Sequence, residues 1–407
     1  MPCPSIRRVE LSQPVEEHRR APSWVPLAAL GFVVLATRAL LIGHRSSWHY
    51  FAAAGTQLFG SAGLDLYDRH PEFQFGPVAV ALAVVVERLP LPSIRPTVII
   101  LGSVAGVVSL LLIERLAREL RPDVSPAVIR RGMWFGGPLF LVAWSDPAVR
   151  NLHIDDVIAL TCIAAAMLLL ARWRPWWATL VLAVAIAAKP WAVVCIPMLL
   201  VGGGRGRLTR PALAALVGGG TFLPFVLDDP HTLTALRRFT IHTSVDSGLR
   251  VLGINALRTP SWDRPLQIVV GLALGCLAVR LGRWYAVPLV SLAFRLLIDP
   301  GTHHYYAAGV ALAVLAWELV EDPEAVPWRT ILAVVVLEAT SEWSPLGHPA
   351  GPLRFALLLF LVVEPLVRRR SPLPPRTATR RSAPAPIGLD GGDRGRGADR
   401  TAALVQP

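Results

Sequence analysis

Apolar residues recur along the chain in long stretches that short polar links separate. After residue 24 the apolar segments cover 25–43, 76–89, 97–114, 132–145, 156–171, 176–201, 212–227, 265–280, 284–298, 304–320, 327–341 and 352–367. A helix that crosses a bilayer needs about 20 mainly apolar residues, and most of these segments approach that length. The pattern predicts an all-α integral membrane protein, a polytopic bundle of about 10–12 transmembrane helices.

Composition agrees with a membrane protein and excludes several other classes. Of 407 residues, 53% are hydrophobic and 17% are charged, whereas soluble domains carry about 25% charged residues. A soluble enzyme, a disulfide scaffold and a disordered chain are therefore excluded. The net charge of +12 comes from arginine, because Lys189 is the only lysine. These arginines lie in short links between apolar segments, which indicates cytoplasmic loops rather than nucleic-acid binding.

The links and tails suggest one membrane domain with polar ends. Residues 1–24 are expected to be a cytoplasmic tail, 25–367 the polytopic domain, and 368–407 a disordered Arg/Pro-rich tail. Two polar stretches are long enough to carry chemistry outside the cytoplasm, a first loop at about 44–75 and a second at about 228–264. We expect a multi-pass protein of the plasma membrane.

The Arg-rich links constrain the topology. They cover 115–131, 172–174, 205–210, 280–283 and 368–370, and they cannot all be cytoplasmic if every segment crosses once. Two changes to this topology would place all the Arg-rich links on the cytoplasmic side of the membrane. Segment 76–89 is short enough to be re-entrant, and segment 176–201 could be a helical hairpin broken at Lys189-Pro190.

The first loop contains an amphipathic pattern. Trp48, Phe51, Gly55, Leu58 and Phe59 recur at helical spacing. The pattern predicts a helix that lies on the membrane surface, where tryptophan favours the headgroup layer. The alternative is a connector that happens to be apolar.

Two cations lie within or beside apolar segments, where a charge is costly. Arg38 lies near the end of the first segment and could either act in a site or extend its side chain to the interface. Lys189 interrupts AVAIAAKPWAVVCIP. Its ammonium suits a lipid phosphate, and the alternative is a helix-end anchor.

Acidic and imidazole groups supply the other candidates. Asp155 and Asp156 follow Asp146, Arg150 and His153, and they could bind a sugar hydroxyl or a divalent cation, or only complement a helix dipole.

In the first loop, His49 and Asp65 could act as a general base, or they could be solvated loop residues. His303 and His304 are adjacent and do not share a helix face, so they predict no metal pair.

The order of several short motifs resembles the C-type (GT-C) glycosyltransferase superfamily, polytopic enzymes that use polyprenyl-phosphate sugars. The motifs are LATRALL, LDLYDRHPEFQFGP, DPAVRNLHIDDVIAL and AIAAKPWAVVCIPML, within about residues 25–225. The branch that looks most similar is family 87, the actinobacterial polyprenyl-phosphate-mannose-dependent mannosyltransferases. The second half of the chain matches nothing specific.

The resemblance implies a helical bundle with a lipid-side groove below extracytoplasmic loops, and it favours a simple crossing for segment 76–89. It also implies an inverting transfer of a sugar, with a first-loop aspartate as the base. The family's acidic motif follows the first span, where this chain has Ser46, Ser47, Trp48, His49 and Tyr50. His49 or Asp65 would then replace the missing aspartate.

These observations lead to one principal hypothesis. The chain would be an enzyme that moves a sugar, with mannose suggested by the resemblance, from polyprenyl phosphate to an extracytoplasmic glycan or glycolipid of the cell envelope. His49 or Asp65 would be the base, Lys189 and Arg38 would hold the phosphate, and Asp156, beside Asp155, would orient the sugar or acceptor. No cofactor is required, although a divalent cation would suit the two aspartates. The alternative is a non-catalytic protein that binds or translocates a polyprenyl lipid on the same scaffold.

Overall fold

The structure is a computed structural model that describes residues 25–41, 46–90, 93–202, 206–238, 240–323, 326–341 and 350–369. All of them belong to one compact unit, Met1–Pro372. The two tails predicted from composition lie outside the described residues, except for Arg368 and Arg369.

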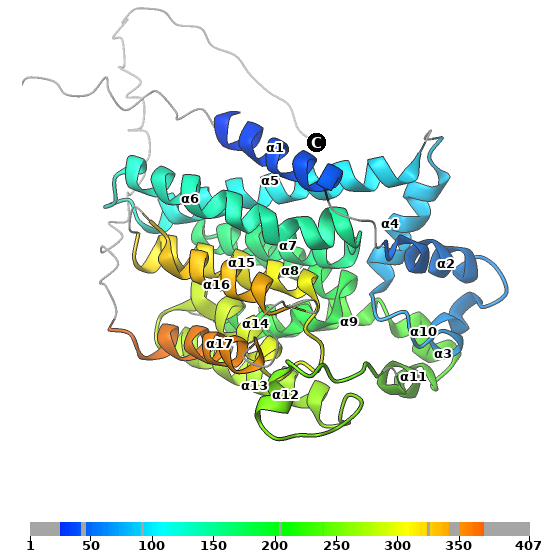
Figure 1. Ribbon diagram of the computed structural model, residues 1–407. Coiled ribbons are helices and arrows are strands. Elements are labelled where there is room, and N and C mark those ends of the chain that lie inside the picture. The colour runs from blue at the N-terminus through cyan, green and yellow to red at the C-terminus, as the bar shows by residue number, and fades with distance from the viewer. Residues whose placement is uncertain are drawn as a thin grey trace, which may run out of the picture. The chain divides into compact units, whose positions relative to one another are not determined.

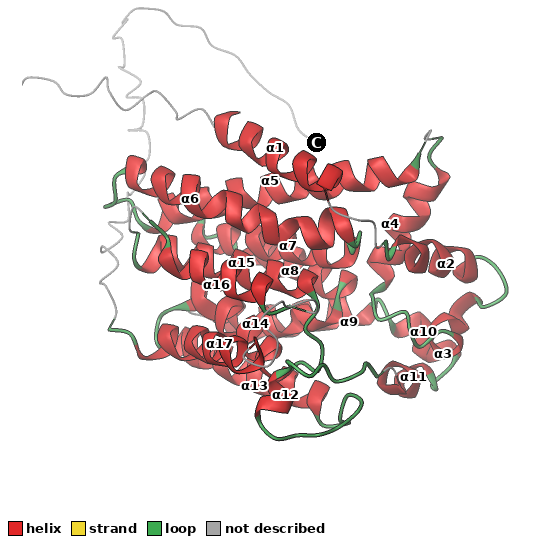
Figure 2. Ribbon diagram, viewed as in Figure 1, coloured by secondary structure: helices red, strands yellow, loops and turns green. Residues whose placement is uncertain are grey.

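The described residues are mainly helical and form no strand (Figure 2). One isolated antiparallel bridge joins His242 and Arg258. The elements are α1 Val25–Leu41, α2 Trp48–Leu58, η2 Gly63–Asp65, α3 Leu66–Arg69, α4 Pro77–Arg88, α5 Ile94–Leu120, α6 Pro126–Ser145, η3 Asp146–Arg150, α7 Ile154–Ala171, α8 Pro175–Ala188, η4 Pro190–Leu200, α9 Gly206–Gly220, α10 Leu223–Asp228, α11 Thr232–Arg238, α12 Gly248–Val251, α13 Asp263–Arg280, η5 Trp284–Ala286, α14 Val287–Ile298, η6 His304–Tyr306, α15 Ala307–Glu321, α16 Trp328–Ala339 and α17 Ala350–Val367.

The apolar pattern predicted the helices well, because each of the twelve apolar segments overlaps at least one helix. Among the described residues, three helices, α5, α7 and α17, are long and apolar enough to cross a membrane. The protein is therefore all-α and has helices suited to a bilayer. Helix α15 forms the centre, because every residue from Ala307 to Glu321 is buried, and it packs against α5, α6, α14 and α16.

The Arg-rich links gather at one end of these helices, which we call the arginine end. Arg121, just after α5, donates to the carbonyl of Val320 near the end of α15 at 2.9 Å. Arg283, just after α13, donates to the carbonyl of Pro365 near the end of α17 at 2.7 Å. Arg172 follows α7 and pairs with the last turn of α5 at 2.8 Å. The opposite end, where Lys189 lies, is called the lysine end.

Segment 176–201 forms the hairpin that the Lys189-Pro190 break predicts. Helix α9 lies against α8 along its length, because the Cβ position of Gly206 faces Trp176 and that of Gly218 faces Ile186. The chain therefore returns through η4 to the level at which α8 began. Proline at 190 cannot continue the hydrogen bonds of α8, and Lys189 has extended backbone angles, φ −143° and ψ 106°.

Helix α4 begins and ends at the lysine end, as a re-entrant segment would, and the simple crossing favoured by the resemblance is not observed. Its start is fixed because Gly76 donates to the carbonyl of Ala188 at 2.8 Å. A Cβ at Gly76 would lie 1.9 Å from the carbonyl oxygen of Ala187, so only glycine permits this approach. At the other end of α4, Glu87 accepts a hydrogen bond from Trp48 Nε1 at 2.6 Å. Figure 1 shows α4 crossing the direction of α5, α6 and α7 at this end.

The amphipathic pattern of the first loop forms helix α2. Trp48, Phe51 and Gly55 are buried, and α2 packs against α4, where the Cβ position of Gly55 meets Val84. Phe59, one residue beyond the helix, is 66% exposed. The predicted helix is present, and its apolar residues cover α4.

Candidate functional site

The hairpin tip holds a buried ion-pair cluster of Lys189, Asp155 and Asp156. The Lys189 ammonium donates to Asp155 Oδ2 and lies 3.4 Å from Asp156 Oδ2. Asp155 has no exposed surface and Asp156 is 5% exposed. Both aspartates lie in the first turn of α7, and Asp155 Oδ1 also accepts the backbone N–H of Asp156 at 2.9 Å. The fold thus brings together three of the residues that the sequence singled out.

His153 extends this cluster towards the first loop. Its Nδ1 lies 3.6 Å from Asp155 Oδ1 and 3.9 Å from Asp156 Oδ2. Its other ring nitrogen, Nε2, lies 3.3 Å from the hydroxyl of Ser47. The ring stacks on Tyr305 with 4.1 Å between ring centroids. A histidine with one ring nitrogen beside a carboxylate and the other at a hydroxyl group has the arrangement of an oriented general base.

An aromatic wall covers the other side of Asp156. Trp191 Nε1 donates to Asp156 Oδ1 at 3.1 Å. The guanidinium of Arg295 lies between the rings of Trp191 and Tyr306, 5.4 and 5.0 Å from their centroids. A cavity of about 10 Å³ remains among these side chains, which is about the space that one water needs. We call His153, Asp155, Asp156, Lys189 and Trp191 the hairpin-tip cluster.

A second polar group lies next to the first and is called the Asp146 cluster. Arg38 donates to Ser145 at 2.9 Å and lies 3.9 Å from Asp146 Oδ1. Arg150 lies 3.5 Å from the same oxygen. On η6, His304 Nδ1 lies 3.6 Å from Glu338 Oε2.

Asp146 is fully buried, and it lies in the link between α6 and α7, outside the apolar segments. Burial, together with the Glu338 carboxylate, raises the pKa of the Asp146 carboxyl to about 6, although His304 and the two arginines act in the opposite direction. Among the described residues, Asp146 Oδ2 and Glu338 Oε1 have no hydrogen-bond partner.

In the described part of the chain, two groups of side chains have ligand atoms close enough together to hold a metal ion. They are Asp146, His304 and Glu338, and His153, Asp155 and Asp156, each with its atoms within 4.8 Å of one another. In the second group the Lys189 ammonium already balances the carboxylates. The sequence predicted no metal pair from His303 and His304, and here only His304 joins such a group.

The remaining predicted residues lie outside these contacts. His49 is exposed, and its Nδ1 lies 2.9 Å from the carbonyl of Ser46. Its segment still borders the hairpin-tip cluster, because Ser47 contacts His153. Asp65 pairs with Arg69 at 2.8 Å, and no contact joins it to Lys189, Asp155 or Asp156 among the residues that the structure describes.

Sequence reasoning missed the importance of His153, Trp191 and Tyr305. The signal for His153 was its position two residues before Asp155 in LHIDD, just before a helix whose first turn is acidic. Trp191 follows the Lys-Pro break, which indicates that it lies near the tip. Nothing in the sequence alone places Tyr305 beside His153, because 152 residues separate them.

Comparisons with protein-family models, with curated proteins and with solved structures found no match to this chain.

Proposed function

We propose that this chain is a membrane glycosyltransferase that moves a sugar from a polyprenyl-phosphate donor to a glycan or glycolipid outside the cytoplasm. The observation that carries the proposal is the contact of a half-buried imidazole and a half-buried ammonium with one buried carboxylate in the hairpin-tip cluster. This cluster lies at the end opposite the Arg-rich links. If those links face the cytoplasm, as such links do in membrane proteins, the cluster opens to the other side.

Each residue of the cluster has a role that follows from its contacts. Asp155 balances Lys189 and faces His153 Nδ1, so it keeps the imidazole oriented. Asp156 Oδ2 accepts no hydrogen bond among the described residues, although Lys189 lies 3.4 Å away. That oxygen can therefore accept a hydroxyl of the sugar or of the acceptor, while Trp191 offers a ring face for the sugar to pack against.

The transfer itself would proceed as one displacement. The acceptor hydroxyl attacks the anomeric carbon of the donor sugar, and the bond from that carbon to the phosphate oxygen breaks. The hydroxyl proton passes to a base, and polyprenyl phosphate leaves with the electron pair. His153 is the base that the contacts favour, and His49 from the adjoining first loop is the second candidate. Arg38 and Arg150 supply positive charge for the leaving phosphate, because each makes only long contacts with Asp146.

A turnover assay tests the proposal directly. Purified full-length protein in nanodiscs receives polyprenyl-phosphate-mannose and an envelope lipid extract, and mass spectrometry follows free polyprenyl phosphate and new glycolipid. His153→Ala is expected to lower turnover at least about 100-fold, since loss of a general base costs that much. His49→Ala and Asp65→Ala show whether a first-loop group is the base instead. His231→Ala is the matched control, because that histidine is 73% exposed and pairs with the nearby Asp229, away from the hairpin-tip cluster.

The same experiment separates the non-catalytic alternative. Equal turnover in wild type and in all three base variants would contradict the catalytic assignment of these residues. Donor lipid that binds without being consumed, and is lost on Lys189→Ala, would instead indicate a protein that binds or translocates polyprenyl lipids.

A further inference from the structure

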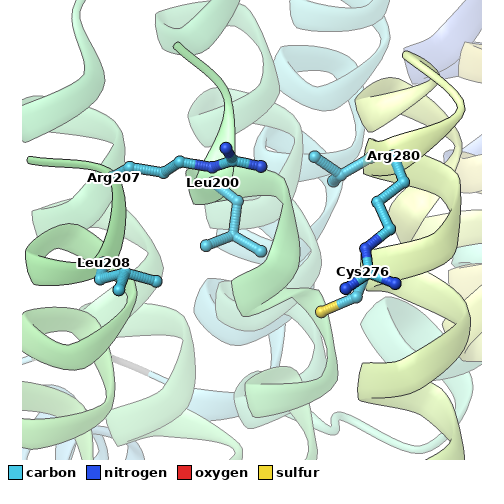
Figure 3. Close-up of a pocket in the computed structure, with 6 residues that line it drawn as sticks. Leu200, Arg207, Leu208, Cys276 and Arg280 are labelled. Atoms are coloured by element: carbon cyan, nitrogen blue, oxygen red, sulfur yellow. The ribbon is translucent and has the colours of Figure 1, made fainter. Parts of the chain in front are cut away.

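A cavity at the arginine end lies apart from the hairpin-tip cluster. It has a volume of about 300 Å³ and lies between the end of η4, the start of α9 and the end of α13. Figure 3 shows Arg207 on one side and Arg280 on the other, with Leu200 and Leu208 near the first and Cys276 near the second. The lining is therefore apolar except for two guanidinium groups and one thiol.

The arginines around this cavity differ in what they bind. Arg210 is buried and donates to the carbonyls of Gly206 and Val201 at 2.8 Å, so it holds the turn between η4 and α9. Arg283 is also buried, and its guanidinium donates to backbone carbonyls at the end of α17. These two arginines have structural partners.

Arg207 and Arg280 have no such partners. Within the described part of the chain, neither forms a hydrogen bond or an ion pair, and no acidic side chain lines the cavity. Both side chains are exposed. Two cations thus border one cavity with no acidic side chain beside it, so an anion in the cavity would be attracted by both.

The surroundings define the anion. Leu208 is 74% exposed beside Arg207, and Leu200 and Val279 continue the apolar lining. A soluble phosphate would gain nothing from these side chains, whereas a lipid buries its glycerol and first methylenes against them. The cavity also lies at the end where Arg-rich links meet the membrane surface, and anionic lipids attract such links.

We propose that the cavity between α9 and α13 binds the phosphate headgroup of an anionic phospholipid, held by Arg207 and Arg280. A volume of about 300 Å³ suits a headgroup and its glycerol rather than a whole lipid. The acyl chains then continue along Leu200 and Leu208 into the bilayer. The site is independent of sugar transfer, because it lies at the opposite end of η4 from Lys189.

Native mass spectrometry of the full-length protein tests the site. Protein purified from nanodiscs that contain phosphatidylglycerol and phosphatidylcholine is expected to retain phosphatidylglycerol. Arg207→Gln and Arg280→Gln are each expected to weaken retention about fivefold, as suits one basic contact with a lipid phosphate. Arg280→Lys should keep most of the retention because it keeps the charge.

The control is Arg130→Gln with Arg131→Gln, two exposed arginines at the same end that do not line this cavity. This variant should retain phosphatidylglycerol as wild type does. Equal loss in the control and in the cavity variants would overturn the proposal, since it would show a general surface charge effect. Equal retention of phosphatidylcholine, or displacement by glycerol 3-phosphate, would also overturn it, because the site would then not select an anionic lipid.

Discussion

Two buried carboxylates at opposite ends of the molecule show how differently the same group can be used. Glu318, at the arginine end, is 2% exposed, and Asp156, at the lysine end, is 5% exposed. Glu318 Oε1 accepts the backbone N–H of Arg329 at 2.9 Å, and its Oε2 accepts both the N–H and the hydroxyl of Thr330. Asp156 accepts one hydrogen bond, from Trp191, and its other oxygen accepts none among the described residues.

The difference separates structural charge from charge that is available for chemistry. Glu318 joins α15 to the start of α16, and its lone pairs are used within the protein. Arg329 then continues a network, because it also contacts Asp322 at 3.4 Å and Glu364 at 2.8 Å. Buried polar groups normally find partners, so an oxygen left without one marks a place where a ligand can bind. Burial alone does not identify a site, and hydrogen-bond satisfaction is the more informative property.

The largest expected effect is on stability at the arginine end. Arg329→Gln removes a cation from three carboxylates on α15, α17 and the link after α15. Breaking a buried ion pair in this way costs about 3–5 kcal/mol of unfolding free energy. Thermal unfolding of the full-length protein in detergent should show the loss, while turnover per folded molecule should stay near that of wild type. A change below about 1 kcal/mol would show that the network does not stabilise the fold.

The second effect is the reverse, a loss of turnover with little loss of stability. Asp156→Asn keeps an oxygen for Trp191 and leaves Asp155 to balance Lys189. Sugar transfer should fall about 100-fold or more, because an amide cannot supply the negative charge at the site. The assay of polyprenyl phosphate release measures the loss, and the unfolding temperature serves as the control. Normal turnover in a folded variant would remove Asp156 from the site.

A smaller effect concerns Asp146 and pH. Its pKa is raised to about 6 in the folded protein, mainly by burial, and is about 4 in an unfolded chain. The folded state therefore binds the proton more tightly, and this carboxyl lowers stability as the pH rises from about 4 to 6. Asp146→Asn should become more stable than wild type across that range, by about 3 kcal/mol at neutral pH, since each pKa unit is worth about 1.4 kcal/mol. Unfolding temperatures measured against pH test this, and a constant difference between the two proteins would contradict it.

The smallest effect is expected for an exposed pair at the arginine end. Arg172 pairs with Glu119 at 2.8 Å, and both side chains are substantially exposed, 45% and 38%. Arg172→Gln should change the unfolding free energy by less than about 1 kcal/mol, since water screens such pairs. Unfolding of this variant beside Arg329→Gln shows whether the arginine end depends on buried contacts. A loss as large as that of Arg329→Gln would mean that exposed pairs also hold this end.

Sequence patterns predicted the elements better than their partners. The helices, the hairpin at Lys189-Pro190 and the position of both ends of α4 at the lysine end all follow from local hydrophobicity, proline and the distribution of arginine. Hydrophobicity and proline act over a few neighbouring residues, and the distribution of arginine reflects the two sides of the membrane. They need no knowledge of which helix neighbours which, and for that reason they could be found in one sequence.

The pairing of charges could not be found in the same way. Lys189 suited a lipid phosphate as an isolated lysine, but in the fold its ammonium faces Asp155, which is 34 residues away. Arg38 likewise meets Asp146 from a distant helix. Asp65 lies within LDLYDRHPEFQFGP, one of the motifs that carry the resemblance, yet it pairs with Arg69, four residues further along the chain. Helix packing brings together residues that lie far apart in the sequence, and the local hydrophobic pattern does not show which helices pack against each other.

The 3₁₀ conformation of η4 determines how the two arms of the hairpin, α8 and η4, match in length. Helix α8 has 14 residues and rises about 21 Å at about 1.5 Å per residue. The 11 residues of η4 cover about 22 Å when wound as a 3₁₀ helix at about 2.0 Å per residue, and would cover only about 16 Å as an α-helix. The 3₁₀ winding therefore lets the 11 residues of η4 span the same distance as the 14 residues of α8. The chain returns to the arginine end, and Lys189 stays at the tip of the hairpin.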